Sequence, residues 1–332
     1  MLIIARTPVR ISFFGGGTDY PEYYKRHGGA VLGTTIDKFS YVSISTPGDY
    51  FNHKIRIGYS KTELISDLEA IEHPSVRECL KFKNYSGNLD IHIFSDLPAK
   101  TGLGSSSSFT VGFLQALYAL LGQQVSKQRL AEEACHVEQN LIRENVGSQD
   151  QFHAAHGGLN IIEFKADRIQ ARPVVLASAK QAYLEQHLMM FYTGLTRHAS
   201  EILQEQMART ESRDNDGYLM RLKEMVFEAE QLFVTEDSES LVKTLGKRLD
   251  EGWQLKKRLS SKITNPFIDQ GYEAAKKAGA YGGKLCGAGS GGFLALLVPP
   301  EKQAAVREAL AGMTAVPVRI ESAGSTVIYM KD

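Results

Sequence analysis

The sequence predicts an α+β protein with two lobes, and three observations lead to this fold class. Strand patterns dominate the first hundred residues, whereas helical patterns dominate after a change of composition at about residues 165–190. Strands first, followed by helices mixed with strands, are typical of α+β folds. With 332 residues the chain is long enough for two domains or one large one, and no linker rich in glycine, serine or proline separates two halves.

The first third of the chain alternates apolar and polar residues, which predicts half-buried strands. We expect these strands at residues 2–5, 9–14, 30–36, 39–46, 54–59 and 88–95. The first two are broken at Pro8, so they form either a hairpin or one bent strand. Residues 64–80 are weakly helical and are interrupted at Pro74.

The segment Pro98-Ala-Lys-Thr-Gly-Leu-Gly-Ser-Ser-Ser-Ser108 fills a turn between a strand and a helix expected at residues 109–121. At such a turn several backbone N–H groups lack partners and the helix dipole is positive, which favours anions. Gly102 and Gly104 permit positive φ and the close approach of an anion. The serines offer hydroxyls that can cap the helix or reach a metal. We therefore expect a phosphate-binding loop, with a simple serine N-cap as the alternative.

Helices and strands are mixed in the rest of the chain. We expect helices at residues 127–144, 198–208, 266–278 and 301–311, with two or three more before residue 258. We expect strands at residues 159–164, 188–192, 293–298, 316–321 and 326–330. Residues 147–158 and the glycine-rich residues 279–292 connect these elements without an assigned helix or strand.

Composition and charge exclude several classes of protein. Hydrophobic residues make up 43%, charged residues 23%, and the formal net charge is zero, so neither nucleic acid nor an acidic membrane is an expected partner. Cys79, Cys135 and Cys286 are too few and too scattered for a disulfide framework or a zinc site. Arg6 interrupts the position of a signal-peptide core, and no apolar run approaches the ~20 residues of a membrane span. We expect a cytoplasmic protein.

Two familiar glycine motifs do not fit. The run Gly287-Ala-Gly-Ser-Gly-Gly292 matches a dinucleotide fingerprint in letters, but a helix precedes it and a strand follows, which is the reverse of the required order. Gly283-Lys284 is followed by leucine, so a P-loop is excluded. The His-Arg-Asp and Asp-Phe-Gly signatures of protein kinases are absent from the sequence.

Phosphoryl transfer would need charged partners for the loop. Glu138, on the flank of an apolar helix face, either points inward toward Mg²⁺ or is one more solvated glutamate. Asp150 has a position that suits a catalytic carboxylate or a turn cap. Arg10 lies in an apolar strand, where an arginine needs an anionic partner. His153 and His156 lack a third ligand at metal spacing, which favours local hydrogen bonding.

Three blocks together resemble the GHMP kinases, the superfamily of galactokinase, homoserine kinase and mevalonate kinase. They are Thr7-Pro-Val-Arg-Ile-Ser-Phe-Phe-Gly-Gly-Gly-Thr-Asp-Tyr20, the loop from Pro98 to Ser107, and Lys284-Leu-Cys-Gly-Ala-Gly-Ser-Gly-Gly292. The resemblance covers the whole chain, with the blocks in the family's order. It implies a two-lobed fold with a β-rich N-terminal ATP-binding domain (residues 1–170) and a ferredoxin-like α+β C-terminal domain (residues 171–332).

The resemblance also implies roles for individual residues. Asp150 matches the family's catalytic base, and Arg10 matches the arginine that helps to activate the attacking hydroxyl. Ser106 and Glu138 would bind Mg²⁺, since Glu138 stands twelve residues before Asp150, a spacing familiar from galactokinases. The residues expected to bind ATP are Pro98, Gly102, Leu103, Gly104, Ser105, Ser106 and Ser107.

Departures from galactokinases bear on the substrate. Those enzymes carry Gly-Glu-His-Thr-Asp-Tyr, whereas Gly15-Gly-Gly-Thr-Asp-Tyr20 lacks the two side chains that grip galactose, which admits a bulkier sugar. With Thr193-Gly-Leu-Thr-Arg197, this block resembles the D-glycero-D-manno-heptose 7-phosphate kinases, which phosphorylate C1 for nucleotide-activated heptose and cell-surface polysaccharide. The expected substrate contacts are Gly16, Gly17, Thr18, Asp19, Arg197, Lys284 and Gly289.

A substrate that already carries a phosphate needs a second cationic site, for which Arg197 and Lys284 are the candidates. Arg197 also lies in Thr196-Arg-His198, which opens a helix after a strand and is a second candidate anion site. Two alternatives stay open: an L-fucose kinase, and a sugar sensor built on an inactive kinase. The sensor would be expected to lose Asp150, Glu138 or Ser106, and all three are present. A homodimer also stays open.

Overall fold

The computed structural model describes the backbone of residues 1–195 and 200–332, and the side chains of all of these except residues 200–203. Its larger sheet has eight strands in the order β12-β1-β2-β5-β3-β4, with β6 paired to β2 and β7 to β6. These strands are β1 Leu2–Phe14, β2 Gly29–Ser45, β3 Ile55–Gly58, β4 Thr62–Ile65, β5 Leu89–Ser95, β6 Leu159–Phe164, β7 Ile169–Pro173 and β12 Thr326–Lys331.

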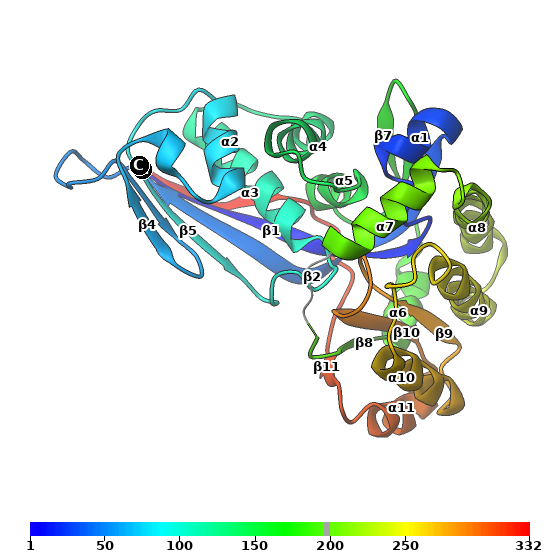
Figure 1. Ribbon diagram of the computed structural model, residues 1–332. Helices are drawn as coiled ribbons and strands as arrows, with labels where there is room; N and C mark the ends of the chain where they lie inside the picture. The colour runs from blue at the N-terminus through cyan, green and yellow to red at the C-terminus, as the bar shows by residue number, and fades with distance from the viewer. Residues whose placement is uncertain (196–199) are drawn as a thin grey trace.

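Helices cover one face of the larger sheet, with α2 to α5 side by side above β1 and β2 (Figure 1). The helices of the first half are α1 Pro21–His27, α2 Pro74–Phe82, α3 Ser105–Leu120, α4 Lys127–His136 and α5 Gln149–His156, with a 3₁₀ turn η1 Leu68–Ala70 and a π-helix η2 Val137–Ile142. Apolar side chains of the sheet and of α2 to α5 form one buried core between these layers.

The smaller sheet is fully antiparallel, with the order β11-β8-β10-β9. Its strands are β8 Leu188–Tyr192, β9 Gly282–Leu285, β10 Phe293–Leu297 and β11 Thr314–Val316. Its helices and those packed beside it are α6 Ser178–His187, α7 Ser200–Glu211, α8 Asp216–Thr235, α9 Ser238–Lys256, α10 Pro266–Lys277 and α11 Gln303–Ala309, with a 3₁₀ turn η3 Pro300–Lys302. Helices connect β8 to β9 and β10 to β11, which is the ferredoxin-like arrangement predicted for this lobe.

The first predicted strands are one element. Strand β1 runs from Leu2 to Phe14 without interruption, and its pairing with β2 shifts register between Pro8 and Val9. A register shift accommodates proline because it interrupts the ladder where proline has no N–H to donate. The bent strand, rather than the hairpin, is therefore the correct alternative.

The serine segment differs from the expectation that it fills a turn. Helix α3 already begins at Ser105, and its N-cap is Gly104, in the left-handed conformation with φ of 73°. The serines therefore form the first helical turn, which turns their backbone N–H groups along the helix axis toward the glycines.

Several other elements were not predicted or have different bounds. Residues expected to start a weak helix at 64 belong to β4, and α2 begins at Pro74, where proline's missing N–H costs nothing. Helix α5, strand β7, helix α6 and strand β9 were not predicted. The helix expected at 127–144 ends at His136 and continues as the π-helix η2.

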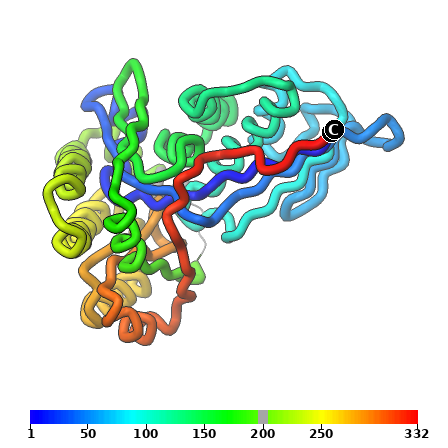
Figure 2. The backbone as a smooth tube through the Cα atoms, turned by 180° about the vertical axis from the view of Figure 1, so that it is seen from behind, coloured from blue at the N-terminus to red at the C-terminus, as the bar shows by residue number. Residues whose placement is uncertain are grey.

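Two strands depart from the division predicted at residue 170. Strand β7 runs across that position and pairs with β6, and β12, at the end of the chain, pairs with β1. Figure 2 shows this last strand returning along the first one. In the part of the chain that the structure describes, no helix combines the length and the apolar character needed to span a membrane.

Candidate active site

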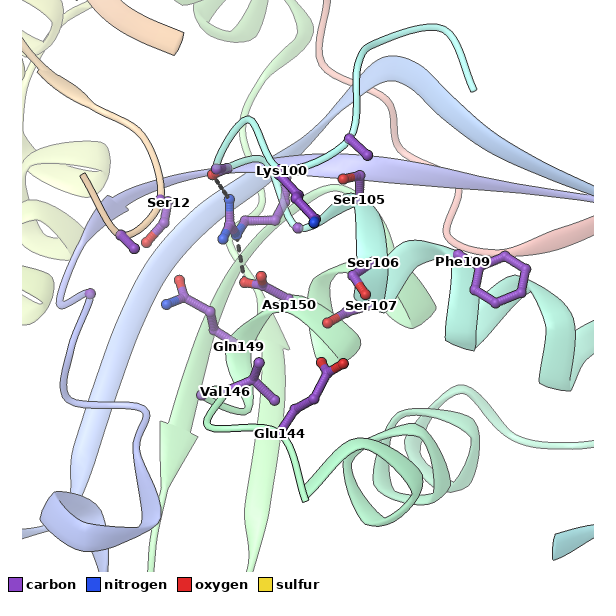
Figure 3. A pocket seen from close by; sticks show the side chains of 18 of the residues that line it. Ser12, Lys100, Ser105, Ser106, Ser107, Phe109, Glu144, Val146, Gln149 and Asp150 are labelled. Carbon is purple, nitrogen blue, oxygen red and sulfur yellow. Dashed lines mark hydrogen bonds and ion pairs between the residues drawn. The ribbon is translucent and has the colours of Figure 1, made fainter. Parts of the chain in front are cut away.

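A cavity of about 630 Å³ opens between the two lobes, within the size range of small-molecule sites. The turn after β1, the segment between β5 and α3, the first turn of α5, the end of α9 and the loop between β9 and β10 all line it. Figure 3 shows the side chains around it, with Asp150 at the centre.

Arg10 and Asp150 meet in this cavity although 140 residues separate them. The Arg10 Nε–H donates to Asp150 Oδ1 at 2.7 Å, and the Arg10 Nη1–H donates to the Gly102 carbonyl at 2.7 Å; Figure 3 marks both bonds with dashed lines. Arg10 is 5% exposed, so its guanidinium is bonded to these two groups rather than to water. This one side chain therefore ties the carboxylate to the glycine loop.

Glycine is required where the loop touches Asp150. A Cβ on Gly104 would lie 2.9 Å from Asp150 Oδ2, and one on Gly102 would lie 2.6 Å from the Cys286 carbonyl oxygen. Both glycines also have positive φ, at 73° and 81°, which other residues adopt only with strain. The loop can therefore lie directly on the carboxylate and on the chain after β9.

Glu138 lies in the π-helix η2, an uncommon element that is frequently found at functional sites. Its Oε2 accepts from Ser107 Oγ at 2.8 Å and from Gln151 Nε2 at 2.5 Å. Burial raises the pKa of the Glu138 carboxyl to about 7. The serine bonded to Glu138 is thus Ser107, while Ser106, predicted as its metal partner, is exposed and lines the cavity.

These residues fit a divalent cation. Glu138 Oε1 is buried and has no hydrogen-bond partner in the part of the chain that the structure describes. Together with the Ser106 hydroxyl it offers the hard oxygen donors that Mg²⁺ prefers. No group of three or more His, Cys, Asp or Glu side chains arranged for a metal occurs among the described residues, so other ligands would be phosphate and water, as is usual for Mg²⁺.

Asp19 also lines the cavity, after the glycine turn that follows β1. Its Oδ1 accepts from the Gly17 N–H at 3.0 Å and its Oδ2 from Gln149 Nε2 at 2.9 Å. Burial raises the pKa of the Asp19 carboxyl, and the charge of Asp150 raises it further. Asp19 therefore holds the turn against α5 and presents a buried carboxylate beside Asp150.

Lys284, on β9, also lines the cavity. Its Nζ donates to the Phe13 carbonyl at 3.1 Å, and burial lowers its pKa to about 8. The predicted contacts Gly16, Gly17 and Gly289 also line the cavity.

Other predicted site residues lie elsewhere. Thr18 is fully buried, and its hydroxyl donates to the carbonyls of Gly15 and Ala30 at 2.8 and 2.9 Å, which holds the turn together. Among the described residues, Thr18, Leu103 and Pro98 are not in the cavity wall. Arg197 lies outside the described residues.

Sequence reasoning missed several residues that do line the cavity, notably Lys100, Glu144 and Lys256. A signal for Lys256 exists, because it follows Leu249 and Trp253 at helical spacing and so lies on the buried face of α9. A lysine is rarely buried at such a position unless a partner compensates its charge.

The far end of the cavity is aromatic. Tyr59, His73 and Phe109 line it, and the His73 ring lies 5.1 Å from that of Tyr59 and 5.0 Å from that of Phe109. The cavity thus runs from an apolar end, past a helix N-terminus with hydroxyls, to a carboxylate beside an arginine. This order of groups suits transfer of a phosphoryl group to a hydroxyl.

Two family models match the chain. The GHMP kinases N terminal domain matches residues 69–158, and the GHMP kinases C terminal domain matches residues 238–314. One match falls in each lobe, and together they cover just over half of the chain.

Similar proteins include kinases of sugars. The D-glycero-alpha-D-manno-heptose 7-phosphate kinase of Campylobacter jejuni is 28% identical over 311 residues, which cover 91% of each chain. The bifunctional fucokinase/GDP-fucose pyrophosphorylase of Arabidopsis thaliana is 25% identical over 323 residues, covering 90% of this chain and 30% of that protein. The crystal structure of a D-glycero-D-manno-heptose 1-phosphate kinase from Bacteroides thetaiotaomicron superposes with a TM-score of 0.80 at 22% identity, over 99% of this chain and 100% of that one.

Proposed function

The chain belongs to the GHMP kinase family, and from this premise we propose that it transfers the γ-phosphoryl group of ATP to the anomeric hydroxyl of D-glycero-D-manno-heptose 7-phosphate. Membership of the family makes it a phosphotransferase with an alcohol as acceptor. The product would be the 1,7-bisphosphate, for nucleotide-activated heptose and cell-surface polysaccharide. The observation that carries the proposal is the Asp150 carboxylate, held by Arg10 against the glycine loop.

Asp150 acts as the general base in this proposal. Its carboxylate accepts the proton of the sugar hydroxyl, a role worth typically 10²–10⁴-fold in rate. Arg10, bonded to Asp150 at 2.7 Å, lies where it stabilises the negative charge that develops on the oxygen. The N–H groups at the start of α3 and the Gly102–Gly104 loop bind the phosphates of ATP.

A divalent cation would be held by Ser106 and by the unpartnered Oε1 of Glu138. When bound, Mg²⁺ neutralises charge on the transferring phosphoryl group. Tyr59, His73 and Phe109 offer the planar apolar surface that an adenine ring needs.

The acceptor lies between the glycine turn and Asp19. Gly16 and Gly17 line this part of the cavity without side chains, and Asp19 keeps one lone pair free for a sugar hydroxyl beyond the three bonds it accepts. Galactose would leave this space partly empty, whereas a seven-carbon sugar fills more of it.

The names of the similar proteins differ on where the heptose already carries phosphate. The Campylobacter relative is named for the 7-phosphate and the Bacteroides structure for the 1-phosphate. We follow the first because its sequence is more similar to this chain, while likeness at 22% identity supports only the fold. A kinase for the anomeric hydroxyl of L-fucose is the second candidate, supported by the similarity to the plant fucokinase.

A panel of acceptors tests the proposal. ADP release is measured with ATP and, in turn, D-glycero-D-manno-heptose 7-phosphate, the same heptose without phosphate, L-fucose, galactose and mevalonate. We expect the highest kcat/KM with heptose 7-phosphate. Turnover of fucose without turnover of heptose 7-phosphate would replace this proposal with the second candidate.

A further inference from the structure

Two lysines end in the cavity without forming an ion pair among the described residues. Lys256, at the end of α9, is 8% exposed and Lys284, on β9, is 7% exposed, and both line the cavity. In the described part of the chain, neither ammonium forms an ion pair; their partners are backbone carbonyls.

Each ammonium has N–H groups to spare. Lys284 donates to the Phe13 carbonyl, and Lys256 donates to the carbonyls of Leu285 and Gly287. Since an ammonium has three N–H donors, these hydrogen bonds leave two donors on Lys284 and one on Lys256 for a ligand in the cavity.

Burying two such cations is unfavourable. Removing an ammonium from water without an ion-pair partner is costly, and here burial lowers the pKa of Lys256 to about 7 and of Lys284 to about 8. After burial, the charge of Lys284 is the next largest cause of the lowered pKa of Lys256, so the two cations also repel each other. An anion between them would remove both penalties.

The two lysines lie on the acceptor side of the cavity. Cys286, Arg10 and Asp19 act electrostatically on both lysines, and Arg10 and Asp19 line the cavity. Lys284 is bonded to the residue two positions before the glycine turn. The candidate cation site is formed by Glu138 of η2 and by the first turn of α3, whereas the two lysines lie on α9 and β9. A group bound by the lysines would therefore belong to the acceptor rather than to the nucleotide.

We propose that Lys256 and Lys284 bind a phosphate that the acceptor already carries, while Asp150 and Arg10 act on its hydroxyl. This inference rests on the proposed function and defines the substrate class more narrowly, as a sugar phosphomonoester. Lysine ammonium groups bind phosphate as point charges. In the ring form of a heptose 7-phosphate, C1 and the C5 side chain that carries the phosphate both flank the ring oxygen, so one molecule presents both groups on one side. Arg10 acts electrostatically on both lysines, so the two pairs of residues lie near each other.

Phosphate binding tests the site without any sugar. Titration calorimetry with inorganic phosphate is carried out with the nucleotide loop saturated by a non-hydrolysable ATP analogue, for the wild type, Lys256→Met, Lys284→Met and Lys257→Met. Lys257 is the matched control, because it follows Lys256 as the C-cap of α9 but pairs with Asp269 at 3.4 Å. We expect affinity to fall about tenfold or more in the first two variants, since a charged hydrogen bond contributes about 1.5–3 kcal/mol. Unchanged affinity in both would overturn the site.

Folding and kinetics complete the test. Methionine retains most of the lysine volume and removes a buried charge, so both variants should fold with an unchanged or higher Tm. With heptose 7-phosphate we expect KM to rise about tenfold or more, with little change in the KM for ATP or for heptose without phosphate. Lys257→Met should leave all three constants unchanged.

The outcomes separate the site from the proposed substrate. If the wild type phosphorylates heptose 7-phosphate and both variants keep its KM, the lysine site is wrong and the proposed function stands. If the wild type does not use heptose 7-phosphate but the variants lose phosphate binding, the site stands and the proposed sugar is wrong.

Discussion

Asp150 is the residue on which the proposed chemistry depends most. In Asp150→Asn the amide oxygen can still accept the Arg10 hydrogen bond seen at 2.7 Å, but it cannot take a proton. We expect kcat to fall by about 10²–10⁴, with nucleotide affinity nearly unchanged in a fluorescent-nucleotide titration. Asp167→Asn, at an exposed position, is the control and should keep full activity. Retained turnover in Asp150→Asn would remove this residue from the role of base.

Asp19 gives a prediction about stability and pH. Its folded-state pKa is raised, chiefly by burial, so the ionised side chain destabilises the fold and the protonated one does not. In Asp19→Asn the charge is removed, and Gln149, whose Oε1 has no partner among the described residues, can turn its amide to accept from the new Asn.

The free energy of unfolding, measured by urea between about pH 4.5 and 8, should therefore be higher for Asp19→Asn than for wild type at neutral pH. The difference should shrink as pH falls through the raised pKa, because wild-type Asp19 then binds a proton. A difference that grows toward low pH would contradict this account. Sugar turnover should be lost at every pH, since the carboxylate acceptor is gone.

The sequence motifs pointed to the residues proposed to carry the chemistry, but they did not predict which of these side chains contact one another. The sequence blocks pointed to Arg10 and Asp150, but no local pattern reports that their side chains meet, because the contact depends on how β1 and α5 pack. That Ser106 and Glu138 share a metal stays a prediction. The hydrogen bond from Ser107 to Glu138 was not predicted, because it depends on the helix beginning at Ser105, which turns Ser107 toward η2.

Helix α3 has a left-handed glycine before its first residue and another beyond its last, which allows a matched comparison. Gly104 has φ of 73° and Gly122 has φ of 65°. A Cβ at position 104 would meet Asp150 Oδ2 at 2.9 Å, whereas at position 122 no described atom lies within 4 Å. We expect Gly104→Ala and Gly122→Ala each to lose about 1–2 kcal/mol of stability from the strained backbone.

Only Gly104→Ala should also lose activity, because its methyl group displaces the carboxylate from the loop. Urea unfolding gives the stability change and ADP release with the best acceptor gives kcat. Equal kcat in the two variants would show that the loop does not need to lie on Asp150.

Elements with strong local patterns were predictable. Strands β6 and β8 have the bounds expected from their apolar runs, and α10 begins at its proline. Elements without such patterns were missed: β9 consists of Gly-Gly-Lys-Leu and is a strand only because β10 pairs with it. The π-helix η2 was also missed, because helical periodicity does not distinguish a widened turn from a regular one.

Across the whole molecule, one buried core joins the two lobes. It includes Ile11 and Leu32 of the larger sheet together with Leu222, Trp253 and Phe293 of the second lobe. Strand β12 adds a further link, since it brings the end of the chain back to β1. The resemblance implied a boundary at residue 170, and a boundary at one position along the chain cannot include a final strand that returns to the first sheet.

We therefore expect the lobes to unfold together, although separate domains often unfold separately. Trp253, the single tryptophan of the sequence, is fully buried in the second lobe, so its fluorescence reports that lobe, while far-UV circular dichroism reports both. In a urea titration the two signals should have one midpoint. Two separated midpoints would contradict a shared core.

The position of the new phosphate on the sugar distinguishes the proposed reaction from phosphorylation at any other hydroxyl. The protein is incubated with ATP and D-glycero-D-manno-heptose 7-phosphate, and the product is examined by proton-coupled phosphorus NMR. We predict two phosphomonoester signals, with the new one coupled to the anomeric proton of C1. A new phosphate coupled to any other proton, or ADP formation without a second sugar phosphate, would contradict the proposed reaction.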